Sequence, residues 1–324
     1  MASPHSVSPG SPAAPERDRA RGLVAVAAAA TIWGSVALFA RWSGAAPFVT
    51  VFWRVAFATA ALLVYVLLRG QLGLLTHLDR RTLLGLVLVG ILLALGWAAL
   101  FTAFTWTTVA TAILLNYIGP VFVAAFTPLA THVPSDRRII IPLVLALFGT
   151  AVIVGPQALN ATGSRNLFGA LLAFAAAIIY AITVLITKRL LAEVPAGLVA
   201  FTQQAVATVV LLPAVFLLPG PSGAAGWVSV AVLGVVHTGL AVLLFFGGLR
   251  LVRADHAAVL SYIEPVAAVI FAALLLAEPL SWYTAVGGAA VIAGGVMVGR
   301  LGGAPSPQGP VLPPPAGGNQ ATTQ

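Results

Sequence analysis

VLSYIEPVAAVIF, residues 259–271, places Glu264 directly before Pro265 in an otherwise apolar segment. Proline removes a backbone donor and clashes with the preceding helical turn, and a charge is costly in a hydrocarbon environment. A related sequence, LLNYIGPVFVAAF, occurs 145 residues earlier at 114–126, with its proline at Pro120. We therefore expect two related broken helices, with Pro120 and Pro265 as hinges.

The composition is typical of a polytopic membrane protein. Of the 324 residues, 60% are hydrophobic and 7% are charged, and the mean hydropathy is +1.05. Ordinary soluble domains carry about 25% charged residues. The apolar residues come in blocks of about twenty, the length that crosses a hydrocarbon core of about 30 Å. We therefore predict an all-α integral membrane protein, with the lipid bilayer as a partner.

The sequence disfavours several other classes of protein. It contains no cysteine, so disulfide bonds and thiolate metal sites are excluded. It shows no glycine-rich phosphate loop, no paired histidine ligands and no plausible Ser/His/Asp set, so we expect no enzyme, no cofactor and no metal site. The net charge of +8 is carried by basic residues at the ends of apolar blocks, which indicates membrane orientation rather than nucleic-acid binding.

Ten apolar blocks define the expected transmembrane helices. They lie at 22–41, 47–68, 82–103, 107–131, 137–155, 166–187, 195–218, 226–249, 254–277 and 280–300. We expect the flanking segments, 1–21 and 301–324, to be disordered tails because small residues and proline dominate them. The first block is longer than the apolar core of a secretory signal, which favours an integral helix.

The basic residues predict how these helices are oriented. Thirteen of the sixteen Lys and Arg residues fall on the side of the N-terminus, whereas Arg41 and Arg165 fall on the opposite side. The remaining one, Arg54, lies inside a helix. Because basic residues accumulate on the cytoplasmic side of a membrane, we expect both termini to be cytoplasmic.

The chain also contains an internal repeat. Residues 100–154 align with residues 245–299 at a shift of 145 without a gap. Each half, 22–155 and 166–300, therefore holds five helices, and an odd number makes the second half enter the membrane from the opposite side. Inverted repeats of this kind are typical of secondary transporters that bind substrate near the midplane. Some channels share the feature, so a channel stays an alternative.

Residues 22–300 resemble the EamA family of the drug/metabolite transporter superfamily. The residues that carry the resemblance are FWRVAFA at 52–58, Thr238, Ala241, Glu264–Pro265, Glu278 and the glycine-rich Gly287–Gly299. The resemblance implies a ten-helix bundle of two five-helix halves around a central cavity. It also implies export of amino acids or other small metabolites across a bacterial plasma membrane. One departure is Gly119, which stands where the first half would need a mate for Glu264.

Arg54 is a candidate for binding the substrate. A charge at the centre of a transmembrane helix costs about 2.5–3.5 kcal/mol on translocon scales, so we expect this residue to face a cavity or a partner. Its planar fork suits a substrate carboxylate. The alternative is that Arg54 reaches outward or bonds a backbone carbonyl for structural reasons.

Two titratable residues are candidates for coupling. Glu264 lies near the expected midplane, where it either carries a proton or binds a substrate ammonium, or else satisfies the broken helix and holds its bend. His237 lies midway along its block, and it is either a proton relay or an ordinary hydrogen-bonded histidine.

Further polar and aromatic residues fall on the helices expected to line the cavity. The candidates for substrate contact are Trp33, Asn116, Tyr117, Gln203 and Tyr262. Packing and interhelical hydrogen bonds are the alternative for each of them. Trp33 matches Tyr180 at a shift of 147, which makes these two residues candidate symmetry partners.

Glycines in the last block predict a close helix contact. Gly288, Gly295 and Gly299 share one face of a helix there. This face allows close approach either inside the monomer or in a homodimer formed through 137–155 and 280–300.

These features together favour a secondary active transporter that exports small polar metabolites by alternating access. Amino acids or their derivatives are the favoured small-molecule substrates, with proton coupling as an option. An uncoupled facilitator or channel-like permease is one alternative. A transporter of cationic drugs or of another metabolite is the other.

Overall fold

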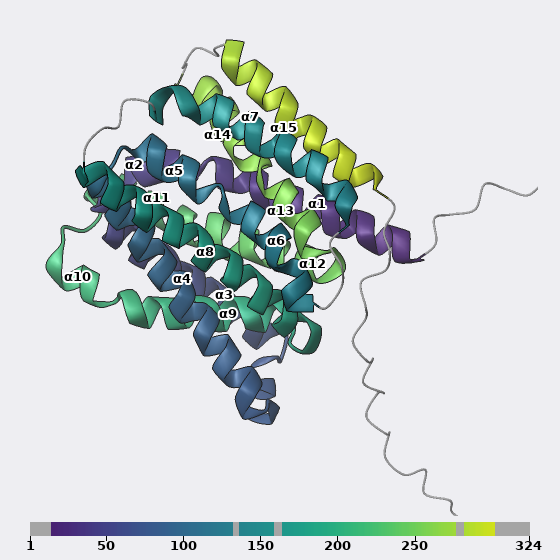
Figure 1. The fold of residues 1–324 in the computed structure, drawn as a ribbon. Coiled ribbons are helices and arrows are strands. Elements are labelled where there is room, and N and C mark those ends of the chain that lie inside the picture. The colour runs from purple at the N-terminus through teal and green to yellow at the C-terminus, as the bar shows by residue number, and fades with distance from the viewer. Residues whose placement is uncertain (1–13, 132–135, 159–163, 277–281, 302–324) are drawn as a thin grey trace, which may run out of the picture.

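The computed structural model describes residues 14–131, 136–158, 164–276 and 282–301. In these ranges the regular structure is helical throughout (Figure 1). Eight helical stretches within them are long and apolar enough to cross a membrane, namely α1–α2, α3, α4, α5–α6, α8, α9–α10, α11–α12 and α13–α14. The chain is therefore a multi-pass membrane protein.

The described elements follow the predicted blocks closely. Those of the first half are α1 (Ala14–Gly34), α2 (Val36–Ser43), α3 (Pro47–Leu68), η1 (Leu72–His77), α4 (Arg80–Trp106), α5 (Val109–Asn116), α6 (Gly119–Thr131), η2 (Arg137–Ile139) and α7 (Ile140–Ala158). Those of the second half are α8 (Ser164–Glu193), α9 (Ala196–Leu211), α10 (Pro213–Leu217), α11 (Gly223–Gly234), η3 (Val235–Leu240), α12 (Ala241–Leu251), α13 (Ala254–Ser261), α14 (Ile263–Leu276) and α15 (Trp282–Arg300).

The first helix begins at Ala14, eight residues before the predicted boundary at residue 22. Arg19 explains this, because its guanidinium donates to the carbonyl oxygens of Val298 at 3.0 Å, of Gly299 at 3.3 Å and of Leu301. The last carbonyls of a helix lack partners within it, so Arg19 fastens α1 to the end of α15. The prediction of a disordered tail is wrong for residues 14–21. Residues 1–13 and 302–324 of the predicted tails, like Glu278, lie outside the described residues.

Both proline-containing blocks are broken, as the sequence predicts. Each break falls at a tyrosine, with φ −70° and ψ −2° at Tyr117 and φ −69° and ψ −5° at Tyr262. Pro120 and Pro265 therefore lie in the first turns of α6 and α14, where a missing backbone donor costs little. Glu264 lies in the same first turn of α14, where the helix dipole favours a negative charge.

The two breaks contact each other directly. The hydroxyl of Tyr262 donates a hydrogen bond to the backbone carbonyl of Tyr117 at 2.5 Å. The side chain of Tyr262 is fully buried. The two breaks are therefore joined at the centre of the bundle.

The predicted block 226–249 is not a continuous α-helix. The segment η3 is π-helical, so the side chain of Thr238 donates to the carbonyl of Leu233 five residues earlier, at 2.9 Å. Gly234, just before it, packs against α3 so closely that a Cβ there would lie 2.8 Å from the carbonyl oxygen of Arg54. Sequence periodicity gave no signal for this extra residue in the turn. π-Helical turns are rare and occur often at functional sites.

Other predicted boundaries also shift. α4 begins at Arg80 rather than at residue 82, because the Asp79 side chain accepts the backbone N–H groups of Arg81 at 3.0 Å and of Thr82 at 3.4 Å. Hydrogen bonds from Thr82 and from the backbone hold the pKa of Asp79 below its ordinary value. The first block is also interrupted, at Ser35 between α1 and α2.

Helices α7 and α15, 19 residues each, lie side by side at one edge of the bundle (Figure 1). A Cβ on Gly287 would lie 2.5 Å from the carbonyl oxygen of Gly149, and a Cβ on Gly294 would lie 2.7 Å from that of Pro142. The close approach therefore uses Gly287 and Gly294, and not the predicted glycine face one residue further along the helix. A Cβ on Gly288 or Gly295 would make only ordinary contacts, with Val266 and Leu260 respectively.

Substitution of Gly287 tests this contact. We expect Gly287→Val to lower the stability of the folded protein by about 1–3 kcal/mol, because the added atoms meet backbone that cannot move aside. Gly299→Val on the same helix is the matched control, since nothing lies within 4 Å of a Cβ there. Thermal unfolding in detergent provides the measurement. Equal melting temperatures for the two variants would contradict the packing described.

One end of the bundle is densely packed. At this end, which we call the basic end because Arg80, Lys188 and Arg250 lie there, α3, α8 and α12 finish and α4, α9 and α13 begin. Its buried apolar residues include Val66, Leu86, Leu191, Leu198, Leu249, Val252 and Ala254. The Thr82 hydroxyl also donates to the Glu193 carboxylate at 3.1 Å, which joins α4 to α8. The chain is therefore closed at the basic end.

Candidate functional site

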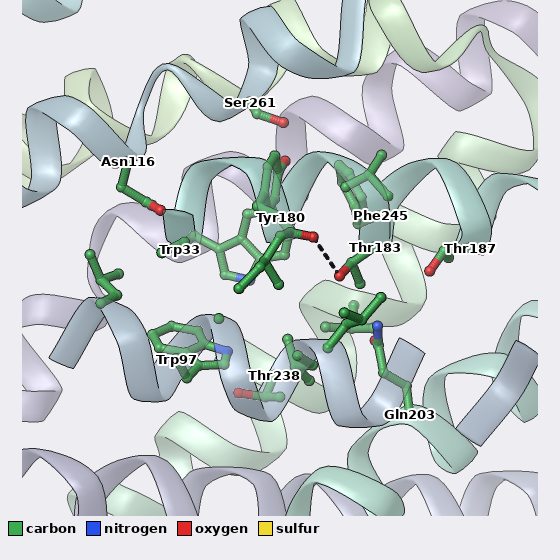
Figure 2. Close-up of a pocket in the computed structure, with 18 of the residues that line it drawn as sticks. Trp33, Trp97, Asn116, Tyr180, Thr183, Thr187, Gln203, Thr238, Phe245 and Ser261 are labelled. Atoms are coloured by element: carbon green, nitrogen blue, oxygen red, sulfur yellow. Dashed lines mark hydrogen bonds between the residues drawn. The ribbon is translucent and has the colours of Figure 1, made fainter. Parts of the chain in front are cut away.

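A cavity of about 250 Å³ lies in the middle of the bundle (Figure 2). Its wall is mainly apolar and aromatic. The polar or ionisable residues among those that line it are Arg54, Asn116, Tyr117, Tyr180, Thr183, Thr187, Gln203, Gln204, Thr238, Ser261 and Glu264. An apolar hollow with a few converging polar groups is the usual form of a small-molecule site.

Arg54 is held rigidly in the wall. It is 8% exposed, and its Nε donates to the hydroxyl of Thr238 at 2.6 Å. Its guanidinium carbon lies 4.7 Å from the centre of the Trp97 ring, a cation–π contact. A guanidinium has five N–H donors, and the bond to Thr238 uses the one on Nε. Its terminal nitrogens are therefore the groups suited to bind an anion.

Glu264 supplies the opposite charge. Its carboxyl group interacts electrostatically with the side chain of Tyr117 and with Arg54. In the part of the chain that the structure describes, no contact of 4 Å or less joins the two charged groups. A guanidinium and a carboxyl group thus face the same cavity without a direct ion pair between them.

Neutral polar groups surround the two charges. Figure 2 shows Asn116 and Ser261 on one side of the cavity and Thr238 and Gln203 on the other. The hydroxyl of Ser261 donates to the carbonyl of Ala257 at 3.0 Å. These groups come from four different helical segments, so they can contact several faces of one ligand.

Trp33 lines the cavity with its ring. Its indole N–H is occupied, because it donates to the backbone carbonyl of His237 at 2.9 Å. The ring packs 5.2 Å from that of Phe245, centre to centre. Trp33 therefore offers an apolar surface to a ligand. Trp33 and Tyr180, matched in the sequence, both belong to the wall.

The structure brings most of the predicted site residues to this cavity. Arg54, Asn116, Tyr117, Trp33, Gln203, Glu264 and the hinge residue Pro120 all line it. Whether they bind a substrate stays a prediction. Tyr262 and Pro265 are not part of the wall, because the break in the helix turns both residues into the protein interior.

His237 also lies behind the wall rather than in it. It is 3% exposed, and its Nε2 lies 2.7 Å from the hydroxyl of Ser35 while its Nδ1 lies 3.3 Å from the carbonyl of Val232. Both ring nitrogens therefore have oxygen partners. His237 is thus hydrogen-bonded at both ring nitrogens, and its role as a proton relay stays a prediction.

Sequence reasoning missed Trp97 as a wall residue, and it gave Thr238 no contact with Arg54. Nothing in the sequence relates Trp97 to Arg54, because the cation–π contact depends on how α3 packs on α4. The contact of Thr238 with Arg54 depends on the π-helical turn. The resemblance to a family marked Thr238 without giving it a role.

Two wall residues have side-chain oxygens that are buried without a partner among the described residues, Thr187 Oγ1 and Gln204 Oε1. Thr183, one turn before Thr187, makes the usual bond to the carbonyl of Ile179 at 2.7 Å (dashed in Figure 2). An unpartnered buried hydroxyl destabilises the fold, and an apolar group of the same shape does not.

Replacing the Thr187 hydroxyl tests whether it lacks a hydrogen-bond partner. We expect Thr187→Val to leave the melting temperature in detergent unchanged or to raise it. Thr183→Val is the control, and we expect it to lower the melting temperature because it removes a hydrogen bond. A melting temperature that falls by as much in Thr187→Val would show that this hydroxyl has a partner.

Comparison with known proteins supports the interpretation of this chain as a transporter. The profile of the EamA-like transporter family matches residues 20–155 and, a second time, residues 167–300. An uncharacterized transporter of Archaeoglobus fulgidus is 28% identical over 279 residues, which are 86% of this chain and 96% of that protein. The uncharacterized transporter YxxF of Bacillus subtilis is 25% identical over 260 residues, which are 80% and 83% of the two chains.

A protein of known crystal structure has the same fold. It superposes with a TM-score of 0.76 at 22% identity, over 86% of this chain and 97% of its own. Because the two family matches together cover more than half of the sequence, this chain belongs to the EamA-like transporter family.

Proposed function

We propose that the protein is a secondary active transporter that exports a small zwitterionic metabolite, an amino acid or a close derivative. The observation that carries this proposal is the pair of opposite charges, Arg54 and Glu264, facing one buried cavity. The cavity volume of about 250 Å³ lies just below the range of about 300–1,000 Å³ that is typical of sites for drug-sized ligands. This size favours a small substrate.

In this proposal the terminal N–H groups of Arg54 bind the substrate carboxylate, and Glu264 binds its ammonium group. Asn116, Tyr117 and Gln203 bond the remaining polar groups, and the ring of Trp33 contacts an apolar portion. Glu264 takes up a proton when the ammonium leaves, so substrate and proton occupy the same carboxylate in turn. This exchange would couple export to the inward flow of protons.

We further propose ten transmembrane helices in two inverted repeats, with both termini in the cytoplasm. Three features support the repeat. The family profile matches twice, and the two breaks fall at tyrosines 145 residues apart. The contacts between α7 and α15 are also reciprocal. Gly287 contacts Gly149, and Gly294 contacts Pro142. The shift of 145 relates Pro142 to Gly287 and Gly149 to Gly294, so it exchanges the two contacts. The distribution of basic residues supports the orientation in a plasma membrane.

Alternating access then opens the cavity to each side in turn. The breaks before Pro120 and Pro265 are where we place the hinges, since the backbone there is already out of helical register. The basic end, which is closed in the structure, corresponds to the cytoplasmic side.

The experiment that tests this function is counterflow in proteoliposomes. Proteoliposomes that contain the purified protein are loaded with unlabelled amino acids. Labelled amino acids are then added outside, with and without a proton gradient. We expect saturable exchange of zwitterionic substrates, at a rate that the gradient alters. Flux that does not saturate would instead indicate a channel-like permease, and exchange of amines that lack a carboxylate would indicate a transporter of cationic drugs. No flux for any of these compounds would overturn the proposal.

A further inference from the structure

Lys188 ties two helices together at the basic end. Its ammonium group donates to three backbone carbonyls at the end of α12, those of Leu249 at 2.5 Å, Val252 at 2.7 Å and Arg250 at 3.2 Å. The last carbonyls of a helix have no partner within it and form the negative end of its dipole. Lys188 therefore fastens α8 to α12 where the bundle is closed.

The repeat gives Lys188 a counterpart at the opposite end. The shift of 147 that matches Trp33 with Tyr180 also matches Arg41 with Lys188. Both residues are basic and both lie in the second part of their block. The side chain of Arg41 is exposed in the last turn of α2, and no hydrogen bond or ion pair of its guanidinium occurs among the described residues.

The acceptors of Lys188 have counterparts as well. The shift of 145 that relates the two halves places α12 on α4, and it pairs Leu249, Arg250 and Val252 with Phe104, Thr105 and Thr107. The two helix ends share the same cap, because the N–H of Thr107 bonds the carbonyl of Ala103 as that of Val252 bonds the carbonyl of Gly248. The end of α4 therefore offers Arg41 the kind of carbonyl cluster that Lys188 occupies.

The backbones of the two helices that carry Lys188 and Arg41 also differ. α8 is one helix of 30 residues, whereas its counterpart is interrupted at Ser35. The part after the interruption, α2, packs against α11, where a Cβ on Gly226 would lie 2.6 Å from the carbonyl oxygen of Ser43. The contact of α8 with the end of α12 thus has no equally formed equivalent between α2 and the end of α4.

We propose that Lys188 and Arg41 are alternating latches, each of which caps the end of its neighbouring helix in one of the two transport states. Lys188 is engaged in the state seen here, which is closed at the basic end. In the opposite state the halves exchange conformations, so α2 straightens toward α4, Arg41 binds the carbonyls of Phe104, Thr105 and Thr107, and Lys188 is released. This inference rests on the proposed alternating access, but not on the identity of the substrate. Neither latch residue lines the cavity.

Opposite effects of the two latches provide the test. Losing Lys188 removes a contact from the state closed at the basic end, and losing Arg41 removes one from the other state. We therefore expect Lys188→Met to shift the population toward opening at the basic end, and Arg41→Met to shift it the other way. Lys188→Arg and Arg41→Lys keep the charge, and we expect both to behave like the parent.

Because the chain contains no cysteine, single reporters are easily introduced. Val252→Cys, at a position 3% exposed, reports opening at the basic end, and Leu100→Cys reports access to the cavity from the opposite side. A membrane-impermeant maleimide is applied to vesicles of either orientation. We expect Lys188→Met to label about fivefold faster at position 252 and correspondingly slower at position 100, and Arg41→Met to do the reverse.

Two results would overturn the latches. One is that both methionine variants change labelling in the same direction, as a general loss of stability would do. The other is that Lys188→Met changes labelling while Arg41→Met does not, which would make Lys188 an ordinary structural contact. Counterflow of the parent is measured beside the labelling. Counterflow without opposite shifts overturns the latches alone, and opposite shifts without counterflow overturn the proposed substrates alone.

Discussion

Replacement of Arg54 with alanine is expected to reduce transport of carboxylate-bearing substrates about 100-fold. A hydrogen bond to a charged group contributes about 1.5–3 kcal/mol, and two such bonds to one carboxylate account for a loss of this size. Counterflow measured over a range of substrate concentrations tests the expectation. Because we propose that Arg54 binds the substrate carboxylate, the defect should be smaller for an amine of the same size that has no carboxylate.

Two controls separate binding by Arg54 from its structural role. Arg54→Lys keeps the charge but loses both the fork and the bond to the Thr238 hydroxyl, so we expect it to recover part of the activity. Thr238→Val keeps Arg54 but releases its Nε from the hydrogen bond of 2.6 Å, and we expect about a tenfold loss. If Arg54→Ala transported carboxylates and amines equally well, the assignment of the carboxylate site would be wrong.

Replacement of Glu264 with glutamine is expected to abolish the response of transport to a proton gradient. Glutamine keeps the size of the side chain and its capacity for hydrogen bonding, but it cannot gain or lose a proton. Exchange of substrate for substrate should continue at a reduced rate, because the amide still accepts a hydrogen bond from an ammonium group. Counterflow and gradient-driven uptake, measured on the same proteoliposomes, separate the two activities.

Tyr117→Phe serves as the matched variant, because it removes the hydroxyl that interacts with Glu264 and leaves the carboxyl in place. We expect this variant to keep its response to the proton gradient. Should Glu264→Gln respond to the gradient as the parent does, the carboxylate would be a structural group at the start of α14 and coupling would have to reside elsewhere.

The sequence alone was sufficient for the larger features of the fold. Apolar blocks predicted the helices, and the repeated tyrosine–proline pattern predicted two breaks. The pattern also explains why Glu264 and Pro265 occur together in an apolar segment. Both residues are unfavourable in the middle of a helix, but both suit the first turn of a new one, and α14 begins at Ile263.

The structural features that the sequence could not predict depend on tertiary packing. The π-helical turn adds one residue to a turn of an apolar helix, and a periodicity of about 3.6 residues cannot detect it in a segment buried on several sides. The cation–π contact of Arg54 with Trp97 likewise depends on how α3 and α4 pack together. The early start of α1 depends on Arg19 reaching the end of α15, a contact across 279 or more positions of the sequence. Local composition predicted a tail at the same place.

The hydrogen bond between the two breaks has a consequence for the cell. If one broken helix changes shape while the other does not, the carbonyl of Tyr117 loses the hydroxyl of Tyr262, and an unpaired buried group costs about 1–3 kcal/mol. Mixed conformations are therefore about five- to 150-fold rarer than they would be without this bond. In the alternating-access cycle proposed above, such mixed conformations would be open to both sides and would let ions through. Under that proposal, the hydroxyl of Tyr262 helps the protein to change state without dissipating the membrane potential.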